Sequence, residues 1–98
     1  MNLGKSIQSA RKKLKISQGE LADASGITQA YLSQIENNKK EPNLSTLKKI
    51  SETLNIPLPI LFFSSLSSED IPDDKKEAFS LINNSLNNLI TSIFTTDK

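Results

Sequence analysis

The sequence contains neither cysteine nor histidine among its 98 residues. These absences exclude a zinc finger, a cysteine nucleophile and any Ser–His or Cys–His catalytic pair. The sequence also lacks a signal peptide and an apolar run of about twenty residues, which predicts a cytoplasmic protein outside the membrane. Carboxylate-only or Ser–Lys chemistry stays formally open, but the acids lie where helix starts and surfaces predict them. We therefore expect no enzyme, no metal and no cofactor.

Charge of either sign is unevenly distributed along the chain. Residues 1–50 hold nine Lys or Arg against four Asp or Glu, a net of +5. Residues 51–98 hold three Lys against seven acids, a net of −4. A basic half beside an acidic half is typical of a polyanion-binding surface, although Lys-rich faces are often only solvated.

Apolar spacing and capping residues predict an all-α fold. Ser17 and Glu20 form a capping-box pattern, and Gly26 can end the helix that follows in a left-handed conformation. Thr28 and Asn43 are N-cap residues for two further helices. The expected helices of this part of the chain cover about 3–14, 18–25, 29–37, 44–54 and 58–63.

The third of these helices has an unusual outward face. Because Leu32 and Ile35 point into the core, the helical period of about 100° per residue fixes the opposite face. That face carries Ala30, Ser33, Gln34 and Asn37, with Gln29 at its edge. A face that is merely solvated is usually charged, whereas this one is not. Gln and Asn can pair with adenine and Ala can contact the thymine methyl, so the face suits the reading of base edges.

Together these residues resemble the phage-repressor and Cro family of helix-turn-helix domains, also called the xenobiotic-response-element family. The match covers roughly residues 5–63. It includes the Ser-Gln start, Ala22, Gly26, the Tyr-Leu-Ser-x-Ile-Glu run at 31–36, Pro42 and the Leu-x-x-Leu pattern. The resemblance implies a five-helix, lambda-repressor-like domain over residues 1–63. It also implies a homodimer that binds a (pseudo)palindromic, double-stranded DNA operator and represses transcription.

By position, the resemblance assigns roles to individual residues. Base reading falls to Gln29, Ala30, Ser33 and Gln34. Contacts with the DNA backbone fall to Gln18, Tyr31, Asn37, Lys39 and Lys40, and Gln18 would also orient the first reading residue. A structural pair, Arg11 and Glu36, would tie the first helix to the third. The rival interpretation is that the reading face is an inert polar surface.

Two positions depart from the family pattern. Asn38 stands where the family usually has Gly, and Pro57 stands where a Ser or Thr usually caps the fifth helix. We expect the first departure to strain the loop that carries Lys39 and Lys40. Neither departure is expected to abolish function.

The remainder of the chain lies outside the resemblance. Residues 64–72 are Ser-rich and acidic and predict a linker, and residues 73–95 predict an amphipathic C-terminal helix. A heptad-like apolar stripe runs along this helix through Phe79, Ile82, Leu86, Leu89 and Ile93. Our hypothesis is that the stripe pairs two protomers, whose recognition helices would then lie about 34 Å apart. The alternative is that it folds back on the fourth and fifth helices of its own chain.

Other functions stay open at this point. The C-terminal helix could bind a different protein, as in an antitoxin that holds a toxin while its domain binds the shared promoter. The fold alone does not prove DNA binding, so a protein-interaction module is also compatible with the sequence. A controller of a restriction-modification system is a further reading of the same domain.

Overall fold

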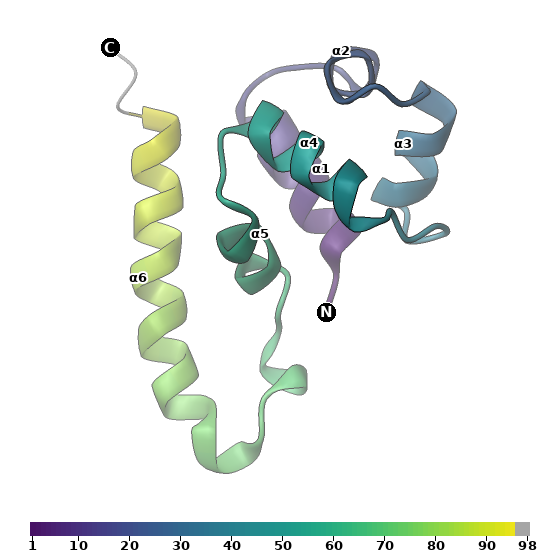
Figure 1. Cartoon of the computed structure of the whole chain (residues 1–98). Coiled ribbons are helices and arrows are strands. Elements are labelled where there is room, and N and C mark those ends of the chain that lie inside the picture. Colours follow the sequence, from purple (N-terminus) through teal and green to yellow (C-terminus); the bar gives the residue numbers. More distant parts are fainter. Residues whose placement is uncertain (96–98) are drawn as a thin grey trace.

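Six α-helices and two short 3-10 turns make up the computed structural model, which describes residues 1–95 (Figure 1). In order these are α1 (Leu3–Lys13), α2 (Gln18–Ser25), α3 (Gln29–Glu36), α4 (Leu44–Leu54), α5 (Leu58–Ser64), the turns η1 (Ser68–Asp70) and η2 (Asp73–Lys75), and α6 (Lys76–Thr95). The described residues contain no strand. The predicted all-α fold, with five helices followed by a C-terminal helix, is confirmed.

Local signals set the helix ends. The predicted capping box is formed, because Ser17 accepts a hydrogen bond from the Glu20 amide while the Glu20 side chain accepts one from the Ser17 amide. Thr28 and Asn43 cap α3 and α4 with a single bond each, because their side chains accept from the amides three residues on. Gly26 ends α2 with a φ of 70°. Pro57 precedes α5 and forms no side-chain cap, as expected from its lack of a hydroxyl.

The hydrophobic core lies among the first five helices. Its fully buried large side chains include Ile7 of α1, Leu32 of α3 and Ile50 of α4. Ala22 of α2 is also buried, and its small side chain lets α2 approach α3 closely. Ile27 packs against this core from the α2–α3 turn and is partly buried. The core therefore fixes α3 from its inner side and leaves its outer side available.

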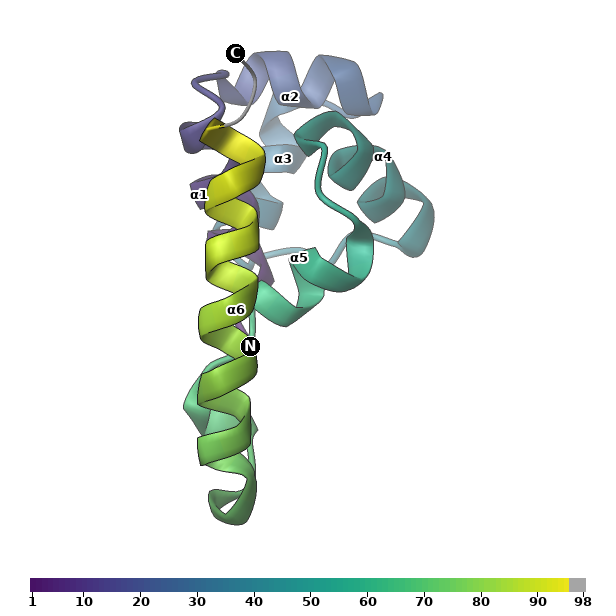
Figure 2. The same cartoon turned by 90° about the vertical axis from the view of Figure 1, so that its left-hand side faces the viewer.

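Helix α6 stands on the opposite side of the molecule from α3 (Figures 1 and 2). It lies beside α5, and the rings of Phe63 and Phe79 stack with their centroids 5.5 Å apart. The segment predicted as a linker begins with the last residue of α5 and contains the turn η1. Within residues 1–95, no helix has both the length and the apolarity that a membrane crossing requires.

Candidate nucleic-acid interface

The outer face of α3 is formed by short and amide side chains. Gln29, Ala30 and Gln34 are exposed, and Ser33 is partly exposed. Glu36 is the one charged residue of α3, and it is buried. The four residues predicted to read bases therefore share an uncharged surface on one short helix.

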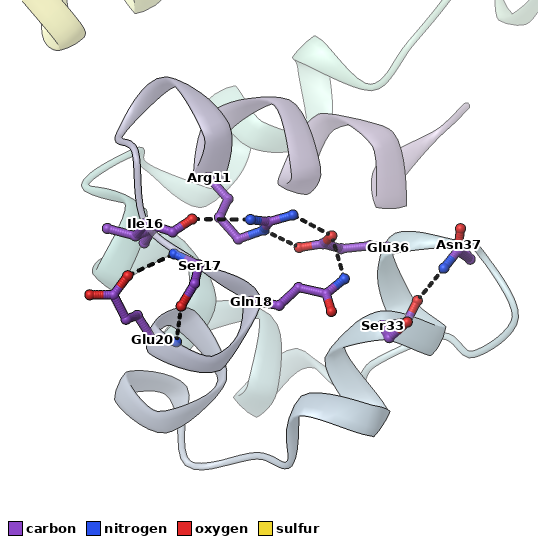
Figure 3. Close-up of polar contacts among 8 residues, drawn as sticks. All are labelled: Arg11, Ile16, Ser17, Gln18, Glu20, Ser33, Glu36 and Asn37. Atoms are coloured by element: carbon purple, nitrogen blue, oxygen red, sulfur yellow. Dashed lines mark hydrogen bonds and ion pairs between the residues drawn. The ribbon is translucent and has the colours of Figure 1, made fainter.

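A buried ion pair holds α3 against α1. Arg11 donates from Nε to Glu36 Oε2 at 2.7 Å and from Nη2 to Glu36 Oε1 at 3.1 Å, a two-point contact (Figure 3). Arg11 also donates from Nη1 to the Ile16 carbonyl at 3.0 Å, in the loop between α1 and α2. Arg11 is 8% exposed and Glu36 4%. Planar pairs of this kind are geometrically demanding, so they fix the angle between the two helices.

Gln18 joins this ion pair as a third member. Its Nε2 donates to Glu36 Oε1 at 3.0 Å, so the start of α2 is tied to the end of α3 (Figure 3). A side-chain amide carries two hydrogens, and the bond to Glu36 engages one of them. Sequence reasoning placed Gln18 on the DNA backbone and did not foresee its bond to Glu36.

The family resemblance implies that Gln18, at the start of α2, orients Gln29. A Cβ atom built on Gly19 would lie 3.6 Å from Gln29 Oε1, so the first turn of α2 adjoins Gln29. That distance is an ordinary van der Waals contact, so a small side chain at position 19 would fit beside Gln29. The hydrogen bond of the Gln18 side chain goes to Glu36 and not to Gln29.

The residues predicted to contact the DNA backbone lie at the start of α2, in α3 and in the segment that follows α3. Tyr31 is partly buried against the core, and Asn37 donates from Nδ2 to the Ser33 carbonyl at 2.9 Å. Lys39 and Lys40 are exposed in the loop after α3. Their backbone amides both donate to the Gln34 carbonyl, at 2.8 and 3.3 Å. The loop that carries the two lysines is thus attached to a predicted base-reading residue.

Asn38 begins this loop in the left-handed conformation, with a φ of 59°. Its side chain forms two hydrogen bonds to the start of α1, one with the Gly4 amide and one with Asn2. The strain expected at Asn38 is therefore accompanied by contacts that a glycine could not make. Asn2 and Gly4 were absent from the sequence-based site, because nothing in the local pattern links residue 2 to residue 38.

The structure divides the apolar stripe of α6. Phe79 and Leu86 are half-buried, whereas Ile82 and Leu89 are 52% and 45% exposed. The neighbouring Leu81 is 68% exposed. The side chain of Ile93, the last residue of the predicted stripe, lies outside those the structure describes. The contacts of α6 with α5 are those of the fold-back alternative, but they cover only part of the stripe.

Comparison with known proteins agrees with this geometry. A helix-turn-helix family model matches residues 7–61. The immunity repressor protein of Bacillus phage phi105 is 36% identical over 56 residues, and the ImmF control region 10 kDa protein of the same phage is 39% identical over 59 residues. The HTH-type transcriptional repressor RghR of Bacillus subtilis is 32% identical over 71 residues. These alignments cover 57%, 60% and 71% of the chain, respectively.

The relatives are longer than their matched parts. The aligned region spans 39% of the immunity repressor, 66% of the ImmF protein and 53% of RghR. It spans 25% of a transcriptional regulatory protein of Methanococcus vannielii. The names of these proteins describe regulation of transcription, phage immunity or its control region, and none describes an enzyme.

Proposed function

The chain belongs to the helix-turn-helix family of transcriptional regulators, and from this premise we propose that it is a DNA-binding repressor that reads its operator with α3. The observation that carries the proposal is the exposed, uncharged face of α3. The one charged residue of that helix, Glu36, is buried. The solvent-exposed face of a surface helix usually carries charged side chains, whereas this face carries amide, hydroxyl and methyl groups.

The chemistry of this face favours A·T base pairs. In the major groove, Arg or Lys commonly recognises guanine, whereas Gln recognises adenine through a paired donor and acceptor. Gln29 and Gln34 supply such amides, and Ala30 can contact the thymine methyl. α3 contains no Arg or Lys. We therefore expect adenine and thymine at the positions that α3 contacts.

The surrounding residues supply contacts that position the domain. Lys39 and Lys40 are exposed and can neutralise phosphates, Tyr31 lies in the first turn of α3, and Asn37 follows its last residue. Gln18 can donate its second amide hydrogen to a phosphate while the first stays on Glu36. Such contacts fix the register on the duplex without reading its sequence. A protein so bound would repress by occluding the promoter.

Two matched substitutions separate reading from positioning. Gln29→Ala should weaken binding to the selected operator by about 1–3 kcal/mol and leave binding to random DNA unchanged. Lys39→Ala should weaken binding to both DNAs alike and lower the salt dependence by about one phosphate contact. Fluorescence anisotropy at several salt concentrations measures both effects. Equal losses on operator and random DNA for Gln29→Ala would exclude base reading by Gln29.

We propose further that α6 pairs two copies of the chain. Leu81, Ile82 and Leu89 form an exposed apolar face, and residues 78–95 carry no charge that would repel a second copy. α6 lies away from α3, so pairing through it leaves both reading faces open to DNA (Figure 2). A two-fold dimer requires symmetric half-sites separated by one helical turn, about 34 Å, or by a multiple of it.

Sedimentation of the full chain tests this pairing. The double variant Ile82→Ser with Leu89→Ser should sediment as a monomer at concentrations where the unchanged chain is a dimer. Asn84→Ser, on the polar face of the same helix, serves as the control and should leave the dimer intact. A dimer that survives the double variant would show that another surface pairs the protomers. A chain that is monomeric throughout would favour the alternative, in which this face binds a different protein, as in an antitoxin.

A further inference from the structure

Asn38 has a backbone conformation that favours glycine. It lies two residues beyond Glu36, where α3 ends, and its φ of 59° is left-handed. Its amide donates to the Ile35 carbonyl at 3.0 Å, and the amide of Lys39 donates to the Gln34 carbonyl at 2.8 Å. Glycine adopts this conformation without steric cost, and Asn is the side chain that tolerates it next best. The backbone conformation alone therefore does not account for Asn at this position, and the contacts of its side chain are the relevant difference from glycine.

The side chain of Asn38 binds the first turn of α1. Its Oδ1 accepts a hydrogen bond from the Gly4 amide at 3.1 Å, and its Nδ2 donates to Asn2 Oδ1 at 2.6 Å. Asn2 Oδ1 also accepts from the Lys5 amide at 3.0 Å. The first amides of a helix have no partner within the helix. Two of those of α1 are thus satisfied by two Asn side chains that are bonded to each other.

The two helices meet closely at this point. A Cβ atom on Gly4 would overlap the carbonyl oxygens of Ile35 and Glu36. Gly4 is buried, and only a residue without a side chain allows the start of α1 to lie on the last turn of α3. We define the contacts among Asn2, Gly4 and Asn38 as the clamp.

Asn38, the member of the clamp that follows α3, directly precedes Lys39 and Lys40 in the chain. The amides of Lys39 and Lys40 donate to Gln34, whose side chain lies on the reading face. Asn38 is the residue from which this loop departs, so its orientation sets the direction in which both lysines leave α3. The clamp ties that orientation to α1, at the opposite end of α1 from Arg11.

We propose that Asn38 is a positioning residue for the DNA-backbone contacts: through the clamp it fixes Lys39 and Lys40 relative to α3. This inference rests on the proposed function, because it concerns the same DNA-binding surface. Asn38 itself does not read bases. The glycine that the family resemblance implies at this position has no side chain and could not form these bonds.

The variant Asn38→Gly removes the clamp without adding strain. Asn55 offers a matched control, because it also ends a helix with a left-handed φ of 58° but forms no side-chain hydrogen bond within the described residues. Both substitutions relieve the same backbone conformation, and only the first breaks the clamp. Asn2→Ser removes the hydrogen bond between residues 2 and 38 and leaves the one to the Gly4 amide, while the shorter serine side chain can still cap the Lys5 amide.

DNA binding is the first readout. Asn38→Gly and Asn2→Ser should lower operator affinity several-fold, and the slope of log affinity against log salt should fall by about one for each phosphate that the lysines no longer neutralise. The ratio of operator to random affinity should change little, because the reading face is untouched. Asn55→Gly should bind as the unchanged chain does. Unaltered affinity and salt slope in a folded Asn38→Gly variant would overturn the proposal.

Amide hydrogen exchange is the second readout and needs no DNA. The Gly4 amide should exchange at least several-fold faster in Asn38→Gly than in Asn55→Gly, since it loses its acceptor. Exchange that is equal in the two variants would show that the clamp does not form. If the unchanged chain binds no DNA while Gly4 exchange behaves as expected, the proposed function fails and the clamp stands. If the unchanged chain binds DNA, and Asn38→Gly alters neither DNA binding nor Gly4 exchange, the clamp is wrong and the proposed function stands.

Discussion

The first five helices bury most of their large apolar side chains, whereas α6 leaves several of its own exposed. In the first five helices, the leucines and isoleucines at positions 7, 21, 32, 35, 50, 54 and 61 are almost wholly buried. In α6, three large apolar residues lie exposed on a helix that has no charge after Glu77. The first region buries its core and leaves polar groups on the outer face of α3. The second leaves apolar groups exposed, which is the basis for the proposal that it pairs two copies of the chain.

The two regions also differ in their ion pairs. Arg11 and Glu36 are buried and hydrogen-bonded at two points, whereas Lys76 and Asp73 form an exposed pair at the start of α6. Removing one member of a buried pair leaves the other charge without compensation. An exposed pair contributes little, because water screens it. This contrast gives the largest effect that we expect.

Glu36→Ala should lower the free energy of unfolding by about 3–5 kcal/mol, because the Arg11 guanidinium would remain buried without a carboxylate. The measurement is urea unfolding followed by circular dichroism. Asp73→Ala is the control and should change stability by no more than about 1 kcal/mol. Similar losses of unfolding free energy in the two variants would show that the buried and the exposed ion pair contribute equally to stability.

Substitution of apolar residues gives the next largest effect. Leu54→Ala should lower the free energy of unfolding by about 2–5 kcal/mol, because it leaves a cavity in the core. Leu89→Ala removes the same side chain from an exposed position and should barely alter the stability of a monomer. Its effect should be on self-association instead, seen in sedimentation. A large loss of monomer stability from Leu89→Ala would mean that this face of α6 is covered within its own chain.

The smallest effect is expected where the regions meet. Phe79→Leu keeps an apolar side chain but loses the ring stack on Phe63, and it should cost about 0.5–1.5 kcal/mol. Amide exchange along α6 should rise, since the stack is part of its contact with α5. Unchanged exchange in α6 would show that Phe79 does not hold the helix in place.

Local features of the fold were predictable from the residues themselves, whereas the one distant contact that was foreseen, between Arg11 and Glu36, came from the family resemblance. Ser17, Thr28 and Asn43 cap helices through amides three residues away, so each signal and its outcome lie in one short segment. Gly26 likewise ends α2 through its own backbone. The bond from Gln18 to Glu36 and the clamp at Asn38 join residues that are 18 to 36 positions apart. No local pattern contains such contacts.

The stripe of α6 shows a second limit of sequence patterns. Apolar residues at heptad spacing require a partner surface, but the spacing is the same whether that surface belongs to the same chain or to another. The structure assigns Phe79 to the chain's own α5 and leaves Ile82 and Leu89 exposed. The structure therefore separates the stripe residue that packs on its own chain from those that stay exposed, a difference that the heptad spacing does not contain.

Selection of bound oligonucleotides from a random pool tests the central claim most directly. The unchanged chain should enrich two symmetric half-sites, with A·T pairs where α3 enters the major groove and a spacing of one helical turn or a multiple. Gln29→Ala should lose the preference at one position of each half-site and keep the others. Failure to enrich any sequence, or enrichment that Gln29→Ala leaves unaltered, would contradict base reading by the exposed face of α3.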